Sequence, residues 1–403
     1  MRVNLIFIFK FYIVIFFLQS IFVLSRIDLI DSIVKGIELA FLFFLSMRIL
    51  QNWENLHLKE RFFILVISIL FVFHFLFVEE SKLELLPKII APIVFYFTGK
   101  YLVSNKAVLG NFWKLFLYLS LFIFPFVILI YQKIINDLTF YSIFVNSNNF
   151  SYYFIVVSVI INLIFPTKQL WVFFFIGIGF ILSSTLGALL AFSISSLFCI
   201  QIKILKKILV FFIFLSLFLL LINTFFDLNS INILKKLEGT FETASKLLNI
   251  NTSISELSKV EYSEAINFSQ NNVSNLSFLF RIKNWTEIIE SISKSSNETY
   301  LFGVGLGNTV KFTSTHLVAH NDYLGLFFEV GVLLSIILIF SYLSVLMKLG
   351  RSIILIPFYT IAIYHFTENL YFNFLITSLH FFLLGFFNNR LIKKHRYESS
   401  PNK

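Results

Sequence analysis

The chain has 403 residues, of which 58% are hydrophobic and only 13% are charged. Soluble domains carry about 25% charged residues, so this composition excludes an ordinary soluble protein. Apolar runs of about 20 residues recur along the chain and predict a polytopic helical membrane protein. The net charge of +10 is not a nucleic-acid signal, because the basic residues gather at the ends of these runs. The single cysteine, Cys199, excludes an internal disulfide.

We expect an all-α fold of about twelve transmembrane helices with one large periplasmic loop. Residues 1–226 would form a bundle of about nine spans, 227–314 the loop, 315–390 three further spans, and 391–403 a basic cytoplasmic tail. No cleavage site of small residues follows the first span, so we expect a retained anchor. In chain order, the expected spans are 5–25, 29–50, 62–78, 86–104, 112–132, 151–166, 169–183, 187–201, 207–226, 323–347, 351–368 and 370–388.

The basic residues predict the orientation of the chain. With the N-terminus inside, the inner ends and loops hold 19 of the 32 Lys and Arg residues, and the short outer loops hold five. This bias follows the positive-inside rule. Both termini are therefore expected in the cytoplasm, and the long loop is expected outside.

The end of the long loop carries the distinctive residues. Segment 278–294 is amphipathic and predicts a helix on the membrane surface or against the bundle. The segment contains Arg281, the only arginine between Arg61 and Arg351. A guanidinium fork can bind a phosphate with two hydrogen bonds. The alternative is an ordinary helix arginine paired with a nearby carboxylate.

His320 begins the segment His-Asn-Asp-Tyr-Leu-Gly-Leu-Phe-Phe-Glu-Val-Gly, where water is expected to meet lipid. An imidazole can accept or donate a proton near neutral pH, although a lone histidine is more often structural. His316 lies four residues earlier, a spacing that suits a metal on one helical face. No third ligand with convincing spacing is present, so we predict no metal and no cofactor.

Helical geometry separates the charged residues of this segment. At 100° per residue, Glu329 would lie on the face opposite His320 if one helix holds both. We therefore expect Glu329 to be structural, unless the helix breaks near Gly325. Upstream, Gly303, Gly305 and Gly307 predict a tight loop that returns the backbone to the membrane, with amides that can contact an anion.

These features together resemble the O-antigen ligase and O-antigen polymerase superfamily of bacterial inner-membrane proteins. The similarity covers about 50 residues by motif and the whole chain by topology, since that family has a large periplasmic loop before the third-last span. The matching residues are Arg281, Trp285, the run Leu301-Phe302-Gly303-Val304-Gly305-Leu306-Gly307-Asn308, and His320-Asn321, Leu324, Glu329 and Gly331.

The resemblance implies a metal-independent membrane glycosyltransferase. Its donor would be an oligosaccharide on undecaprenyl diphosphate, and its acceptor a sugar hydroxyl of a glycan or of lipid A core. His320 and Arg281 would be catalytic: His320 would activate the acceptor hydroxyl or assist the departing diphosphate, and Arg281 would bind the diphosphate. We expect substrate binding at Gly303, Gly305, Gly307, Asn321 and Asp322, and structural roles for Trp285, Glu329 and Gly331. Membrane lipids and a chain-length regulator are further expected partners, and nucleic acid is not.

One departure from the family pattern concerns a Ser-Arg pair that many members have before the eighth span. Here that turn reads Ser-Ser-Thr-Leu-Gly from residue 183 and has no arginine, which leaves Arg281 alone or with an outer lysine such as Lys88. The motifs do not separate a polymerase of lipid-linked repeats from a ligase that loads lipid A core, and we favour the polymerase. A transporter or flippase of lipid-linked glycans is the alternative of another class. Its mid-membrane charges are not evident here.

Overall fold

The computed structural model describes residues 28–78, 80–102, 147–164, 185–199, 276–350, 352–371 and 373–398, with positions 176, 180, 213 and 239–241. All regular structure in these residues is helical, so the fold is all-α as predicted. The expected spans at 5–25, 112–132, 169–183 and 207–226 lie wholly or almost wholly outside the described residues.

Ten α-helices cover most of the described residues. They are α2 (Asp28–Gln51), α3 (Leu58–Phe77), α4 (Leu86–Phe97), α6 (Ser147–Ile164), α8 (Leu186–Cys199), α13 (Leu276–Lys294), α14 (Asn297–Phe302), α15 (Asp322–Leu349), α16 (Ile356–Tyr364) and α17 (Phe374–Glu398). A π-helical turn, η3 (Thr98–Leu102), extends α4, and 3-10 turns occupy Trp53–Asn55, Leu83–Leu85, Thr309–Lys311 and Ile353–Leu355. Because α17 runs to Glu398, residues 391–398 are helical and continue the last expected span.

Two of the described helices, α3 and α15, are long and apolar enough to cross a membrane. The number of about twelve spans therefore stays a prediction. The outward face of α3 is nevertheless continuously apolar, a surface that soluble monomers rarely expose and that a lipid-facing helix requires. It exposes Leu58, Phe62, Leu65, Ile69, Val72, Phe73, Leu76 and Phe77.

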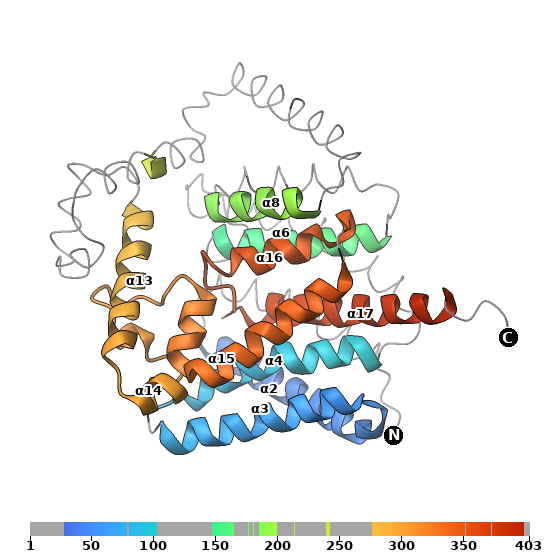
Figure 1. Cartoon of the computed structure of the whole chain (residues 1–403), viewed down its shortest axis with the longest axis horizontal. Helices are drawn as coiled ribbons and strands as arrows, with labels where there is room; N and C mark the ends of the chain where they lie inside the picture. Colours follow the sequence, from blue (N-terminus) through green and yellow to red (C-terminus); the bar gives the residue numbers. More distant parts are fainter. Residues whose placement is uncertain are drawn as a thin grey trace.

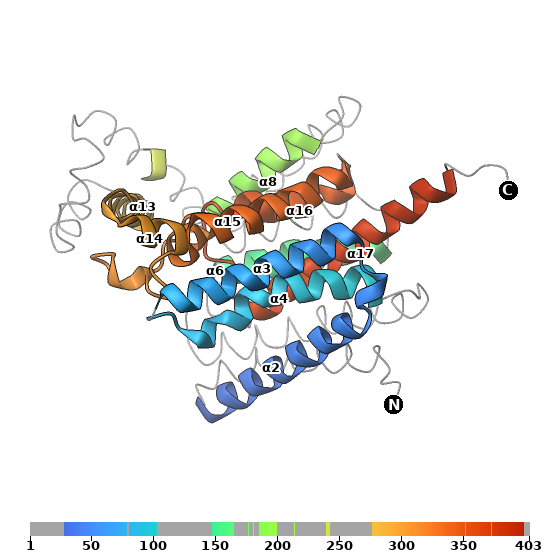
Figure 2. The ribbon, with the colours of Figure 1, turned by 60° about the horizontal axis from the view of Figure 1, so that its bottom comes forward.

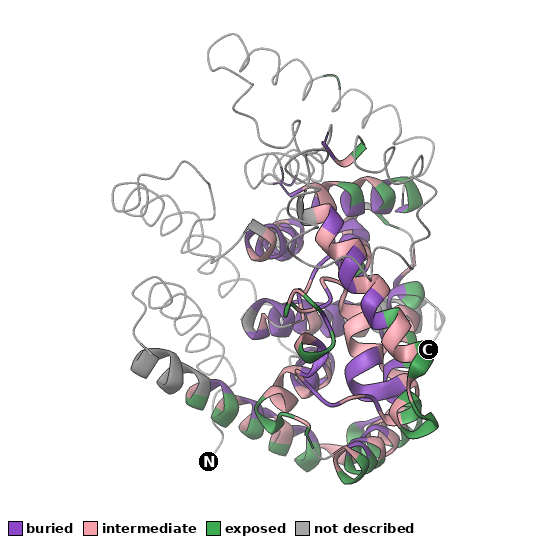
Figure 3. Ribbon diagram, turned by 90° about the vertical axis from the view of Figure 1, so that its left-hand side faces the viewer, coloured by how far each residue is buried: buried purple, intermediate pink, exposed green. Residues whose placement is uncertain are grey.

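Most helices run roughly along one direction, and α13 lies across one end of them (Figures 1 and 2). We call the end with α13 and α14 the outer end. The opposite end carries Lys59, Lys100 and Lys348, and we call it the basic end. Buried residues line the inside of the assembly, and exposed residues follow the outward faces of its helices (Figure 3). The expected amphipathic segment 278–294 is thus a helix, α13. It lies across the outer end of the bundle (Figure 1).

The helices α4 and α17 cross at two glycines. A Cβ on Gly99 would lie 2.0 Å from the carbonyl oxygen of Phe382, and one on Gly385 would lie 2.0 Å from that of Tyr96. Small residues allow helix backbones to approach this closely inside a membrane. The crossing holds α17 closely against α4 and its π-helical extension.

Candidate functional site

A buried glutamate, Glu368, joins four segments of the chain at the outer end. One carboxylate oxygen, Oε1, forms an ion pair with Arg281 Nη2 of α13. The other, Oε2, accepts a hydrogen bond from Asn148 Nδ2 of α6 at 2.6 Å and lies 3.5 Å from His320 Nδ1. Arg281 and His320, the two catalytic candidates, are therefore brought together, through a carboxylate that sequence reasoning did not single out.

Glu368 is buried, whereas Arg281 and His320 are partly exposed to solvent. The side chain of Glu368 is 3% exposed, whereas those of Arg281 and His320 are 22% and 32% exposed. A buried carboxylate needs paired charges and hydrogen bonds to offset its desolvation, and Glu368 obtains both. Solvent and ligands can therefore reach Arg281 and His320, whereas Glu368 is shielded from them.

The turn that carries Glu368 is organised by Asp322. The Asp322 carboxylate accepts hydrogen bonds from the backbone amides of Leu370 and Tyr371 at 2.8 and 3.1 Å, and contacts His365 Nδ1 at 2.6 Å. The Asp322 amide in turn donates to the carbonyl of His365 at 2.8 Å. These contacts enclose the turn on both sides of Glu368. The described contacts of Asp322 position the glutamate, and its expected role in substrate binding stays a prediction.

His320 lies just before α15 rather than within it. Its φ is +48°, in the left-handed region, and Asn321 caps the helix by accepting a hydrogen bond from the Leu324 amide at 3.0 Å. The assumption that one helix holds both His320 and Glu329 is therefore wrong. His316 also has a left-handed φ of +53° and lies in a non-helical segment, so the two histidines do not share a helical face.

A break in α15 falls at Gly331, whose φ is +80°, and not near Gly325. The break leaves the carbonyls of Phe328 and Glu329 without their usual partners one turn later. The amides of Val304 and Gly305 supply the missing hydrogen bonds, both at 3.0 Å. The loop that contains Gly303, Gly305 and Gly307, here called the glycine loop, thus supplies the hydrogen bonds that the break removes from α15.

Gly303 and Gly331 lack a Cβ and therefore allow the backbones of the glycine loop and α15 to approach closely. A Cβ on Gly303 would lie 2.3 Å from the carbonyl oxygen of Glu329, and one on Gly331 would lie 2.2 Å from that of Leu301. Both residues have a positive φ, which glycine adopts without strain. The expected structural role of Gly331 agrees with these contacts.

The carboxylate of Glu329 holds the loop. It accepts hydrogen bonds from Thr309 Oγ1 at 2.7 Å and from the backbone amides of Gly307 and Thr309. The amides of Gly303 and Gly305 donate to the carbonyls of Thr299 and Glu329. All three glycine amides therefore have partners within the chain, and the expected substrate binding by them finds no support in these contacts.

Helix α13 is docked so that Arg281 faces the turn of Glu368. Trp285 Nε1 donates to the carbonyl of Ala319, next to His320, at 2.6 Å. Glu287 pairs with the buried Lys283 at 2.7 Å and accepts hydrogen bonds from the backbone and hydroxyl of Ser314. Trp285 thus has the contacts of a structural residue, and these contacts fasten α13 to the segment that precedes His320.

Sequence reasoning missed Glu368, Asn148 and Tyr364, whose hydroxyl donates to Asn148 Oδ1 at 3.2 Å. The available signal was an acidic residue at the outer end of an expected span otherwise free of carboxylates. Near the start of α8, Gly187 packs closely against the segment that carries Glu368, since a Cβ on Gly187 would lie 2.8 Å from the hydroxyl of Thr367.

The arrangement can supply a base and a donor of hydrogen bonds. With Nδ1 of His320 directed at Glu368, the second ring nitrogen remains for an external proton. Arg281 Nε is buried and has no hydrogen-bond partner in the described part of the chain. No protein-family model matches the sequence, and no curated protein matches it as a relative.

Proposed function

We propose that the chain is a membrane glycosyltransferase of the O-antigen polymerase type. It would transfer a glycan from undecaprenyl diphosphate to a sugar hydroxyl at the periplasmic face of the inner membrane. The observation that carries the proposal is the contact of Glu368 with both Arg281 and His320. These contacts bring together the imidazole of His320 as a base, the carboxylate of Glu368 that orients it, and the guanidinium of Arg281.

His320 is the general base in this proposal. The acceptor hydroxyl attacks the anomeric carbon, the bond from that carbon to the diphosphate oxygen breaks, and the hydroxyl proton passes to the second ring nitrogen of His320. Glu368 accepts a hydrogen bond from Nδ1, which selects the tautomer and stabilises the imidazolium that forms, as in a Ser-His-Asp triad. The contact of 3.5 Å is long for a hydrogen bond, and such contacts often shorten when substrate binds.

Arg281 is the residue that meets the departing diphosphate. Its pairing with Glu368 cancels much of its net charge, so it acts through directed hydrogen bonds more than through long-range attraction. The Arg281 side chain is 22% exposed, so its guanidinium can present N–H donors on the open side of the cluster. Donors fixed in advance stabilise charge that develops on a leaving group.

The acceptor distinguishes the polymerase from the alternatives. A polymerase lengthens a lipid-linked repeat, a ligase loads lipid A core, and a transporter moves its cargo without changing it. The purified chain in liposomes, given a lipid-linked oligosaccharide alone, should form a ladder of longer products. Product formed only when lipid A core is added would favour the ligase, and unchanged donor under both conditions would contradict transfer.

Two histidine variants test the site within the same assay. His320→Asn should lower turnover by about 10²- to 10⁴-fold, the usual contribution of a general base. Asparagine tolerates a left-handed φ, so the change adds little strain. His316→Asn is the matched control, because His316 has the same backbone conformation and is exposed. Equal activity of both variants would remove His320 from catalysis.

A further inference from the structure

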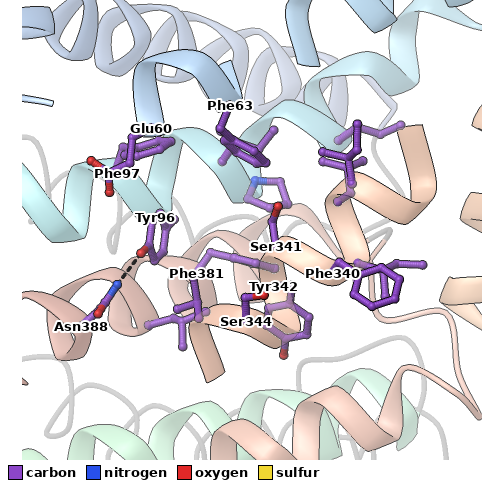
Figure 4. A pocket seen from close by; sticks show the side chains of 18 of the residues that line it. Glu60, Phe63, Tyr96, Phe97, Phe340, Ser341, Tyr342, Ser344, Phe381 and Asn388 are labelled. Carbon is purple, nitrogen blue, oxygen red and sulfur yellow. Dashed lines mark hydrogen bonds between the residues drawn. The ribbon is translucent and has the colours of Figure 1, made fainter. Parts of the chain in front are cut away.

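A long cavity of about 860 Å³ lies between α3, α4, α15 and α17, apart from the Glu368 cluster. Its volume is in the upper range of small-molecule pockets. Phe63, Tyr96, Ser341 and Phe381 line its middle (Figure 4). Its lining reaches from Tyr323, at the start of α15, to Lys348 near the end of that helix.

The two ends of the cavity differ in charge. At the outer end the charged lining residues are Asp322 and His365, which are already paired with each other. At the basic end the cavity is lined by His57, Lys59, Glu60, Lys100 and Lys348.

Glu60 is the only carboxylate among the lining residues at that end, and it is already engaged. It forms an ion pair with Lys100 and accepts a hydrogen bond from the hydroxyl of Tyr101. Lys59 and Lys348 form no ion pair with any residue that the structure describes. Two exposed ammonium groups therefore remain in excess at the mouth of an apolar cavity.

We infer that this cavity holds an anionic glycerophospholipid of the cytoplasmic leaflet, with its phosphate at Lys59 and Lys348 and an acyl chain along the apolar middle. Basic pockets between membrane helices on the cytoplasmic side bind lipid phosphates in this way. The distribution of Lys and Arg predicts that the basic end faces the cytoplasm. The site is thus distinct in place and chemistry from the outer cluster.

The charge asymmetry decides the direction of the lipid. A lipid whose phosphate lay at the outer end would meet the already paired Asp322 and His365, where the carboxylate would repel it. A phosphate at the basic end meets two ammonium groups and can extend its chain over Ile337, Ile93 and Leu326. Glycerophospholipids with a net negative headgroup fit this end better than zwitterionic ones.

Lipid retention by the full chain tests the inference. The purified, delipidated protein is mixed with equal amounts of phosphatidylglycerol, phosphatidylcholine and a polyprenyl phosphate, and the retained lipid is identified by mass spectrometry. We expect phosphatidylglycerol to be retained preferentially. The double variant Lys59→Gln/Lys348→Gln should weaken its binding by about 30-fold, or about five-fold for each lysine.

Three further variants make the result specific. Lys294→Gln/Lys311→Gln removes the same charge from exposed lysines elsewhere and should leave retention unchanged. Lys59→Arg/Lys348→Arg keeps the charge and should retain the lipid. Ser341→Trp fills the middle of the cavity and should lower retention of the acyl chain. Equal retention of both glycerophospholipids, preferential retention of the polyprenyl phosphate, or indifference to Lys59 and Lys348 would overturn the inference.

Discussion

Two buried glutamates near the outer end of the bundle, Glu329 and Glu368, have different surroundings. Glu329 is held by a hydroxyl and two backbone amides of one short loop. Glu368 contacts an arginine, a histidine and an asparagine from three distant segments. Amides and hydroxyls do not change protonation state near neutral pH, whereas an imidazole does. The comparison indicates that the partners of a buried carboxylate, more than its burial, mark the reactive site.

The sharpest test of this comparison changes each glutamate to glutamine. Glu368→Gln should lower turnover by about 10²- to 10⁴-fold, because its amide can donate to His320 and thereby select the wrong tautomer. Glu329→Gln should preserve turnover per folded molecule and lower the free energy of unfolding by about 1–3 kcal/mol, since one buried acceptor is replaced by a weaker one.

Turnover on a lipid-linked donor and thermal unfolding in detergent separate these two effects. An inactive but fully stable Glu329→Gln protein would reverse the assignment of the two glutamates. A fully active Glu368→Gln protein would show that the carboxylate serves only to anchor α13.

Replacing Arg281 by lysine tests whether geometry or charge matters in the cluster. Lysine can keep the ion pair with Glu368 but loses the planar fork of N–H donors. A lost charge-assisted hydrogen bond costs about 1.5–3 kcal/mol, or about 10- to 150-fold in rate when it is made in the transition state. Turnover of Arg281→Lys beside Arg281→Ala gives the measurement, and near wild-type activity of the lysine variant would exclude a role in gripping the diphosphate.

The glycine loop should respond in stability when it is made bulkier. Gly303→Ala introduces a Cβ that would lie 2.3 Å from the carbonyl oxygen of Glu329, at a φ of +83°. Gly350→Ala is the matched control, because its φ is +78° and nothing lies within 4 Å of the added Cβ. The control should cost about 1–3 kcal/mol for backbone strain alone, and Gly303→Ala clearly more. Equal melting temperatures for the two variants would mean that the loop does not pack tightly on the break in α15.

The smallest expected effect concerns an exposed ion pair that joins the turn Thr309–Lys311 to Glu80, in the segment between α3 and α4. Lys311 lowers the pKa of Glu80, first through a hydrogen bond and then through its charge. Because the pKa is lower in the folded state, the pair stabilises the protein above the ordinary glutamate pKa, near 4.5, and this stabilisation is lost as the pH falls through the lowered pKa of Glu80. Lys311→Gln should therefore lower the melting temperature slightly at neutral pH and by less as the pH falls below 4.5, and an equal effect at every pH would contradict the pairing.

Local sequence patterns were enough to predict several elements of the fold. Apolar runs predicted the helices α2, α3, α4, α6, α8, α15, α16 and α17, since burial or lipid contact of a helix depends on the composition of its own residues. The amphipathic period predicted α13, and the isolated arginine and histidine directed attention to the outer end. Glu368 escaped notice because a carboxylate at the end of an apolar span is chemically ordinary until its neighbours are known.

The amino-acid sequence by itself determined which segments are helical and apolar, and which carry unusual side chains. Only the tertiary structure decided that α15 begins after His320 and breaks at Gly331, because the break is stabilised by amides of a loop about 26 residues earlier in the chain. It also decided that Arg281, His320 and Glu368 meet. Their contacts with Glu368 join residues 48 and 87 positions apart, and contacts of that range depend on packing of whole helices, which no local pattern encodes.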